Sequence, residues 1–141
     1  ANGATNWRNP TPVQFMLPAG VKAVDIWSTA YAGRVSNLFV VGDDGKVYGA
    51  GSNENGQLGT GDKVSRNTPT PMQLFGSGPT APRAKHVESG GGTTVIFTTD
   101  NRVYTVGNNN RGQLGDGTTT DSTVPILGRY TNVPIQEHLV F

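Results

Sequence analysis

The sequence predicts an all-β protein built from repeated units of antiparallel strands. Its 141 residues include 20 Gly and 9 Pro, and charged residues make up only 15%. So many turn-forming residues require short elements, which favours strands over helices. The third observation is a repeat, because GSNENGQLGTGD (51–62) returns as GNNNRGQLGDGT (107–118). A repeat of this length indicates stacked units that each form one supersecondary element.

The longest gapless match joins LFVVGDDGKVYGAGSNENGQLGTG (38–61) to TVIFTTDNRVYTVGNNNRGQLGDG (94–117). The distance along the sequence from a residue of the first copy to its counterpart in the second, for example from Gly51 to Gly107, is called here the repeat offset. Each copy opens with a short apolar run that is rich in β-branched and aromatic residues, which is typical of a strand. DDGK (43–46) and TDNR (99–102) then place Asp and Gly or Asn in the order of a tight turn. The segments KVYGAG and RVYTVG follow as return strands, so each unit is predicted to contain a β-hairpin.

Two further strands are expected in each unit. TPTPMQL (68–74) aligns with TVPIL (123–127), and this alignment leaves the preceding loop two residues shorter in the second unit. Pro71 and Pro125 suit the start of an edge strand, since proline cannot donate a hydrogen bond to a sheet. A fourth, weaker strand is predicted from the resemblance of VKAV to AKHV, within VKAVDI (21–26) and AKHVES (84–89).

The glycine-rich motif that follows each return strand is predicted to have structural roles. Its glycines permit positive φ angles and close backbone approach; they are Gly51, Gly56, Gly59, Gly107, Gly112 and Gly115. Leu58 and Leu114 are lone apolar residues in polar loops, so they are expected to point inward. The amides of Gln57 and Gln113 can bond loop backbone groups, and Asn53 and Asn109 are expected to cap a turn. None of these roles needs a ligand.

Both units share one order: a strand, an Asp-Gly or Asp-Asn turn, Val-Tyr, and then x-Gly-x-Asn-x-x-Gly-Gln-Leu-Gly. This pattern resembles the repeats of the regulator of chromosome condensation family over roughly residues 21–131. The resemblance implies four-stranded blades of a seven-bladed β-propeller. The units also depart from the family pattern: Asn37 and Thr93 stand where the family has His, Trp27 replaces a usual glycine, and Ala50 and Val106 stand where the family has Trp.

The repeats divide the chain into four expected parts. Residues 1–20 are the tail of an incomplete blade, 21–82 the first blade, 83–131 the second blade, and 132–141 the stub of a following or shared blade. A propeller closes with about four to eight blades, whereas units spaced by the repeat offset make about two and a half blades here. The expected fold is therefore an incomplete ring of β-propeller-type blades. Other chains, or a missing part of a parent chain, would complete it.

An insertion in the first unit is the candidate binding site. The stretch IWSTAYAGRVS (26–36) has no counterpart in the second unit and contains Trp27, Tyr31 and Arg34. Aromatic residues and Arg are enriched at the centres of protein interfaces, and variable loops often carry binding. The alternative is that Trp27 and Tyr31 pack on the edge of their own blade. The sequence leaves these two interpretations open.

No residue is predicted to be catalytic or to bind a metal or a cofactor. Asp116, Thr118 and Asp121 lack the spacing and the closing Glu of an EF-hand calcium loop, so they are interpreted as turn residues. His86 and His138 are isolated in the sequence and are interpreted as surface residues. The chain has no Gly-x-Ser-x-Gly nucleophile motif.

The composition also limits the classes of partner that the chain is expected to bind. A net charge of +1 offers no basic excess for nucleic acid, and no long apolar run suits membrane insertion. The favoured function is a non-enzymatic protein–protein interaction or scaffold module, whose partner is another protein or copies of itself. One alternative is a subunit of an extracellular fibre or adhesin, which the low charge and the high Thr, Asn and Gly content favour. This alternative implies a secreted or cell-surface location. The other, implied by the resemblance, is part of a guanine-nucleotide exchange propeller for a small GTPase.

Overall fold

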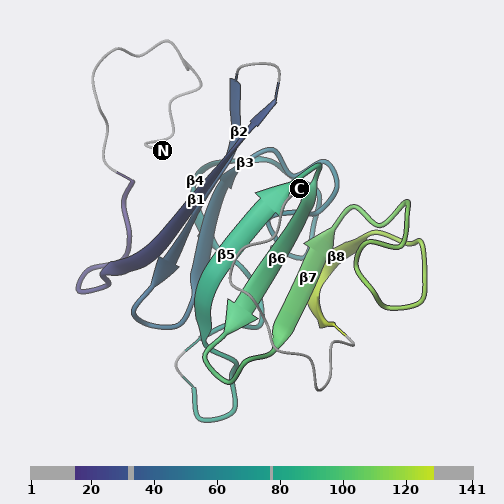
Figure 1. Ribbon diagram of the computed structural model, residues 1–141. Helices are drawn as coiled ribbons and strands as arrows, with labels where there is room; N and C mark the ends of the chain where they lie inside the picture. The colour runs from purple at the N-terminus through teal and green to yellow at the C-terminus, as the bar shows by residue number, and fades with distance from the viewer. Residues whose placement is uncertain (1–14, 32–33, 77, 129–141) are drawn as a thin grey trace.

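The computed structural model describes residues 15–31, 34–76 and 78–128, which form two four-stranded antiparallel sheets (Figure 1). In each sheet the strands lie side by side in chain order. The first sheet contains β1 (Ala23–Tyr31), β2 (Arg34–Gly42), β3 (Val47–Gly51) and β4 (Arg66–Pro71). The second contains β5 (Ala84–Gly90), β6 (Thr93–Thr98), β7 (Val103–Gly107) and β8 (Ser122–Leu127). The predicted all-β fold of antiparallel blades is confirmed. The expected stub, residues 132–141, and most of the expected N-terminal tail lie outside the described residues.

The predicted hairpins are present in both sheets with the same register. Val41 of β2 lies opposite Val47 of β3, and Phe97 of β6 lies opposite Val103 of β7. The two pairs are separated by the repeat offset, so the gapless sequence match is also a structural match. Side chains alternate between the two faces of a strand, so equal registers place equivalent residues on equivalent faces of the two sheets.

The outer strands keep this offset, which corrects the alignment expected from the sequence. Gly51 lies opposite Arg66 and Gly107 lies opposite Ser122. The loops before β4 and β8 therefore have the same length, and the predicted difference between them is wrong.

The prolines of the outer strands follow from this register. Pro69, not Pro71, is the counterpart of Pro125, and both lie inside their strands, while Pro71 ends β4. The prediction that Pro71 and Pro125 begin these strands is wrong, but both strands do lie at a sheet edge. At an edge, alternate N–H groups point away from the sheet, so a proline can occupy such a position without removing a ladder bond.

The first strands also differ from the expected alignment. Ile26 lies opposite Val40, and Val87 lies opposite Ile96. Because the second strands keep the repeat offset, Ile26 rather than Val24 is the counterpart of Val87. Irregular pairing near the start of β1 and β5 accompanies this shift.

The main hydrophobic core lies between the two sheets. In Figure 1, β1 lies beside β5, and both β1 and β2 contact β5. The ring of Phe75 meets that of Tyr104 edge-on, with centroids 5.3 Å apart. The buried core residues are Phe39, Val41, Val47, Leu58, Met72 and Phe75 from the first blade and Ala84, Val87, Ile96, Tyr104 and Val106 from the second. Packing of one blade on the next therefore buries apolar surface that neither sheet could bury alone.

Candidate functional site

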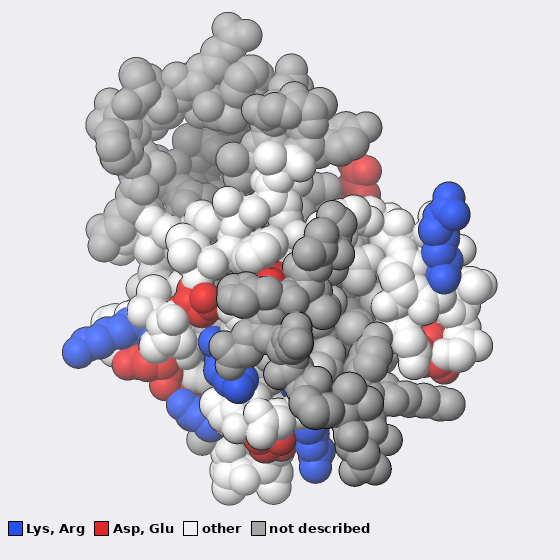
Figure 2. Space-filling view, viewed as in Figure 1, with Lys and Arg blue, Asp and Glu red and all other residues white. Residues whose placement is uncertain are grey.

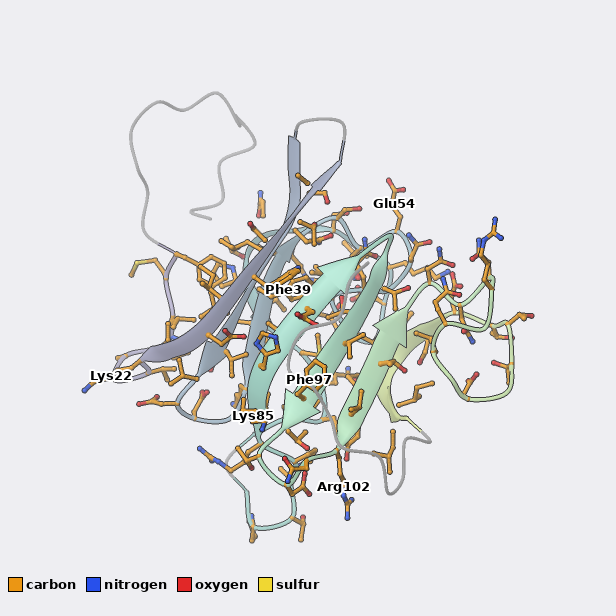
Figure 3. All side chains as sticks on the ribbon, viewed as in Figure 1. Lys22, Phe39, Glu54, Lys85, Phe97 and Arg102 are labelled. Carbon is orange, nitrogen blue, oxygen red and sulfur yellow. The ribbon has the colours of Figure 1, made fainter. Side chains whose placement is uncertain are left out.

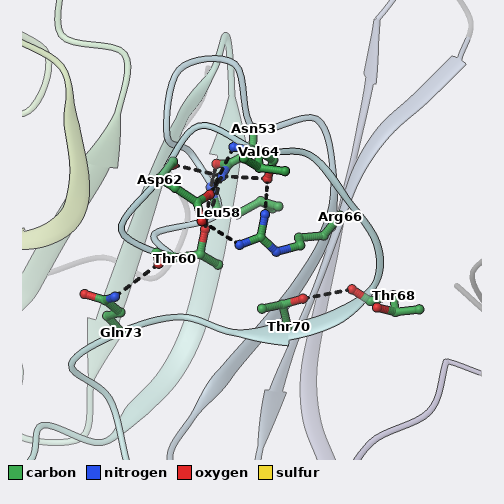
Figure 4. Close-up of polar contacts among 9 residues, drawn as sticks. All are labelled: Asn53, Leu58, Thr60, Asp62, Val64, Arg66, Thr68, Thr70 and Gln73. Carbon is green, nitrogen blue, oxygen red and sulfur yellow. Dashed lines mark hydrogen bonds and ion pairs between the residues drawn. The ribbon is translucent and has the colours of Figure 1, made fainter.

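A buried asparagine organises residues 52–65, called here the first loop. Asn53 has no exposed surface, and its Oδ1 accepts the N–H of Leu58 at 2.9 Å. Its Nδ2 donates to the carbonyl oxygens of Asp62 and Val64 at 3.0 and 3.1 Å (Figure 4). One amide side chain thus ties the middle of the loop to its returning end.

Residues 108–121, called here the second loop, repeat this arrangement around Asn109. Its Oδ1 accepts the N–H of Leu114 at 2.9 Å, and its Nδ2 donates to the carbonyl oxygens of Thr118 and Thr120 at 3.1 and 3.0 Å. Each bond is related to its counterpart in the first loop by the repeat offset. Both asparagines therefore connect distant parts of a loop, which is a larger role than the predicted capping of one turn.

A Thr–Asp pair closes each loop, but the order of the two residues is reversed. Thr60 Oγ1 donates to Asp62 Oδ1 at 3.1 Å in the first loop, and Thr118 Oγ1 donates to Asp116 Oδ1 at 2.8 Å in the second. In both loops the hydroxyl and carboxylate oxygens lie 3.2 Å from the amide nitrogen of the buried asparagine. The same three-group contact is thus made by either order of the pair.

The remaining motif residues have roles that match their expected chemistry. Leu58 and Leu114 have no exposed surface and point inward. The Oε1 atoms of Gln57 and Gln113 each accept the backbone N–H two residues earlier, at 3.0 and 2.9 Å. These contacts form the internal frame of each loop.

The carboxylate of Asp62 is held in its charged form. Arg66 Nη2 donates to Asp62 Oδ2 at 2.7 Å, and the N–H of Val64 donates to Oδ1 at 3.0 Å. These bonds lower the pKa of Asp62 from 3.8 to about 2, and the bond from Arg66 has the larger effect.

Acid is expected to remove the stabilisation that this carboxylate supplies. Because the pKa of Asp62 is lower in the folded state than in the unfolded state, the charged carboxylate stabilises the fold above pH 3.8. This contribution is lost as the pH falls to about 2. Denaturant unfolding of the wild type and of Asp62→Asn across this range should give free energies that converge as the pH falls. Arg66→Gln is the matched variant, because it keeps the carboxylate and removes the main cause of the shift. Parallel pH profiles for wild type and Asp62→Asn would contradict the assignment.

The insertion is shorter than the sequence predicted. Ser28 and Ser89 occupy equivalent positions, so residues 26–29 have counterparts in β5 and the extra length begins at residue 30. The extra residues lengthen the β1–β2 hairpin, which projects beyond the sheets in Figure 1. β1 and β2 have nine residues each, whereas β5 and β6 have seven and six. Tyr31 ends β1 and lies opposite Arg34, the first residue of β2. The side chains of these two residues lie outside the described part of the structure, so their part in binding stays a prediction.

Trp27 and Asp25 connect the first blade to the second. Trp27 Nε1 donates to the carbonyl oxygen of Ser89 at 2.9 Å. Asp25 Oδ2 accepts the N–H of Val87 at 3.1 Å and lies 2.7 Å from Nδ1 of His86. β5 is the first strand of its sheet, so side chains of β1 bond to backbone groups at its outer edge. Trp27 is partly buried against the main core, and its indole N–H is used in this joint.

A groove opens between the lengthened hairpin, the first loop and the turn that joins β5 to β6. It is called here the hairpin groove, and it is lined by residues 27–30, 36–37, 52, 54–55, 57 and 89–92. Its lining is rich in hydroxyl, amide and glycine backbone groups, and Glu54 is the one charged side chain among the lining residues that the structure describes. Of the predicted binding residues, Trp27 lines this groove. Residues 28–30 and 36 of the lining also lie in the stretch predicted to bind, whereas no local pattern marks the lining residues of the first loop and of the β5–β6 turn.

Both acidic and basic side chains lie on the surface of the described chain. Figure 3 shows Glu54 at the end of the sheets from which the hairpin projects, with Lys22 and Arg102 toward the other end. On the face drawn in Figure 2, the coloured Lys and Arg side chains are interspersed with Asp and Glu and form no single patch. A carboxylate in a lining of neutral polar groups favours a basic ligand over a phosphate.

His86 is not the surface residue that the sequence predicted. Its side chain is only 13% exposed, and its ring lies 5.5 Å from that of Phe97. It also lies 3.4 Å from Glu88, whose side chain is buried. His138 lies outside the described residues. Within the described ranges, no group of three His, Cys, Asp or Glu residues could hold a metal ion, and no helix has the length and apolarity to cross a membrane.

Comparison with known families decides what the repeat is. The model of the Regulator of chromosome condensation (RCC1) repeat matches residues 44–97 and 100–136, which is more than half of the chain. The chain belongs to the RCC1 repeat family. The first RCC1 match runs from the β2–β3 turn into β6, so one sequence repeat spans parts of two blades.

The RCC1-type relatives are much longer than this chain. It is 32% identical over 134 residues to the X-linked retinitis pigmentosa GTPase regulator of Canis lupus familiaris, covering 87% of the chain and 12% of the relative. It is 33% identical over 152 residues to the Protein RCC2 homolog of Danio rerio, covering 94% and 30%. The crystal structure of Prp20p from Saccharomyces cerevisiae matches with a TM-score of 0.64 and 18% identity, over 83% of this chain and 28% of that one. This chain thus spans a small part of each of these proteins.

Proposed function

We propose that this RCC1-type chain is a non-enzymatic protein-interaction module that binds an extended, basic segment of a partner in the hairpin groove. The lengthened β1–β2 hairpin is the observation that carries the proposal. It gives the first blade a wall that the second blade, with its shorter β5 and β6, does not have. A feature confined to one of two repeats is better explained by recognition than by the needs of the common fold.

The lining of the groove suits a peptide. The Ser28 hydroxyl and the Asn55 amide can each donate and accept hydrogen bonds. The hydroxyls of Thr29 and Ser36 lie 2.8 Å apart and bond each other, which leaves each of them further acceptor capacity. An extended peptide offers alternating N–H and C=O groups that such a surface can bond. Glu54 adds a carboxylate, which favours a Lys or Arg side chain in the segment.

The relatives support protein recognition at a coarse level. One relative is named as a GTPase regulator, and the Prp20p structure is described with its binding to Gsp1p and histones. Nucleotide exchange on a small GTPase would be a special case of such recognition. The hairpin groove proposal does not depend on it.

Selection from a random peptide library displayed on phage tests this proposal. Peptides enriched on the wild-type chain are expected to contain Lys or Arg in an otherwise extended, turn-poor sequence. Glu54→Gln should weaken their binding by about tenfold, the loss of one charge-assisted hydrogen bond. Ser28→Trp, which fills the groove from β1, should abolish it.

Asp100→Asn is the matched control, because it removes an exposed carboxylate from the β6–β7 turn, outside the groove lining. It should leave peptide affinity unchanged. Circular dichroism and thermal melting of each variant establish that the fold is intact. Enriched peptides that bind Glu54→Gln and Ser28→Trp as well as the wild type would overturn the proposal.

A further inference from the structure

An Asn-Gly pair borders the hairpin groove. Asn55 lines the groove and is half-buried, and Gly56 follows it directly. Asparagine is a thermolabile residue, because the backbone nitrogen of the next residue can attack its side-chain carbonyl carbon. Glycine has no Cβ and hinders this attack least. The second loop lacks the pair, since Arg111 is the counterpart of Asn55 and precedes Gly112. Of the two loops, only the one that borders the groove carries this chemistry.

The side-chain amide of Asn55 lies against the β5–β6 turn. A Cβ on Gly92 would come within 2.5 Å of Asn55 Nδ2 and within 3.2 Å of Asn55 Cγ, so the amide packs on a residue without a side chain. Glu54 and Asn55 both belong to the lining of the groove. A carboxylate formed at Asn55 Cγ would therefore add a second negative charge to this lining.

The attacking atom would be the backbone nitrogen of Gly56, and two contacts restrain it. Its N–H donates to the carbonyl oxygen of Asn53 at 3.0 Å, which closes a tight turn. The turn also lies against the second blade, because a Cβ on Gly56 would come 3.0 Å from the carbonyl oxygen of Ser122 and from Cα of Thr123. The nitrogen can attack only while the turn is open. Folded proteins open locally in this way, so the contact between the blades should set the rate.

We propose that Asn55 is a site of spontaneous deamidation, which gives the hairpin groove a second carboxylate. The Gly56 nitrogen forms a bond to Asn55 Cγ, and its proton passes through water to the departing amide. The Cγ–Nδ2 bond breaks and ammonia leaves, so residues 55 and 56 share a cyclic imide. Water then opens the imide at either of its carbonyl carbons, which gives aspartate or isoaspartate. The two steps together exchange water for ammonia, and no oxidant or reductant takes part.

The two products differ in the backbone. In isoaspartate the chain runs through the former side chain, so one more carbon atom lies between the nitrogen of residue 55 and that of Gly56. Gly56 has little room to move against Ser122 and Thr123, so isoaspartate should also weaken the contact between the blades. Aspartate keeps the backbone and changes only the charge. The variant Asn55→Asp therefore reproduces the charge alone.

The effect on binding rests on the proposed function. A basic segment in the groove would meet two carboxylates in place of one, so Asn55→Asp should bind basic peptides about tenfold more tightly, the gain of one charge-assisted hydrogen bond. The reaction itself is measured by mass and needs no ligand. If the wild type selected no basic peptides, the proposed function would fail while deamidation at Asn55 could still be observed.

Incubation of the folded chain at mildly alkaline pH, followed by peptide mapping with mass spectrometry, tests the site. The fragment that contains Asn55 should gain the mass of one amide-to-acid conversion, and part of it should contain isoaspartate. Asn110, which is exposed and precedes Arg111, is the internal control and should stay intact over the same period. Asn55→Gln should show no conversion at residue 55, because the larger ring that glutamine would form closes far more slowly.

Thr94→Val tests whether the contact between the blades controls the rate. Thr94 Oγ1 donates to the carbonyl oxygen of Gln57 at 2.8 Å, and loss of this bond should speed the reaction about fivefold. Thr105→Val is the matched control, since it removes a bond of equal length to the carbonyl oxygen of Leu114, inside the second blade. It should leave the rate at Asn55 unchanged. Thermal melting before incubation establishes that each variant is folded.

Two results would overturn the proposal. One is an intact Asn55 in the folded chain after a period in which the chain unfolded in guanidinium chloride has lost the amide completely, because the turn would then exclude the reaction. The other is binding of basic peptides by Asn55→Asp that is no tighter than that of the wild type while Glu54→Gln still weakens it. Residue 55 would then add no charge to the groove.

Discussion

Replacing Gly51 with alanine will lower the free energy of unfolding by on the order of 3 kcal/mol. Gly51 has φ of +114°, and a Cβ there would overlap the carbonyl oxygen of Ser36. That oxygen accepts the N–H of Ser52 at 2.9 Å, so it cannot move away without losing the bond that starts the first loop. Denaturant unfolding of wild type and Gly51→Ala measures the effect.

Two other glycines separate close approach from backbone strain. Gly107→Ala should reproduce the loss, because its φ is +108° and its added Cβ would overlap the carbonyl oxygen of Gly92. Gly20 has φ of +82° and open space around it, so Gly20→Ala should cost only the strain, about 1 kcal/mol. If Gly51→Ala cost no more than Gly20→Ala, contact with Ser36 would not be the reason for glycine.

The sequence was sufficient to predict the two hairpins, because the residues that form a hairpin are close together in the sequence. A tight turn fixes which residues face each other, so the gapless match of 38–61 to 94–117 carried the register of β2–β3 into β6–β7. The outer strands needed more than the sequence match. The sequence alignment matched Pro125 to Pro71, because the residues around them are similar. The strand register, set by the pairing of Gly107 with Ser122, instead makes Pro125 the counterpart of Pro69. Pairing with the hairpin, rather than local similarity, decides that register.

The candidate site was predictable only where residue type was informative. Trp27 stood out as an aromatic residue in the stretch predicted to be an insertion, and it does line the hairpin groove although Glu88 is its counterpart in β5. Glu54 and Asn55 sit in a repeat motif whose composition predicts a structural loop, so nothing local indicates that they face a groove. Their position depends on the length of the β1–β2 hairpin and on how the second blade stacks, which are tertiary properties.

Replacing Asn53 with alanine is expected to destabilise the chain by about 3 kcal/mol, as much as the glycine change. The substitution leaves the N–H of Leu58 buried without its acceptor. It also releases the carbonyl oxygens of Asp62 and Val64, which water can reach more easily because Val64 is exposed. The buried donor therefore supplies most of the cost. Thermal and denaturant unfolding should both report the loss, whereas Asn110→Ala, on the exposed part of the second loop, should stay within about 0.5 kcal/mol of wild type.

Asn53→Asp tests the two ends of the side chain separately. An aspartate keeps an acceptor for the N–H of Leu58 but cannot donate to Asp62 and Val64, and it places a buried charge beside the Asp62 carboxylate. It should therefore be at least as destabilising as alanine at neutral pH, and the loss should decrease in acid as the new carboxyl takes up a proton and regains a donor. Wild-type stability for Asn53→Asp at neutral pH would mean that acceptance from Leu58 alone holds the loop, and that the shared geometry of the amide donor in the two loops has no energetic role.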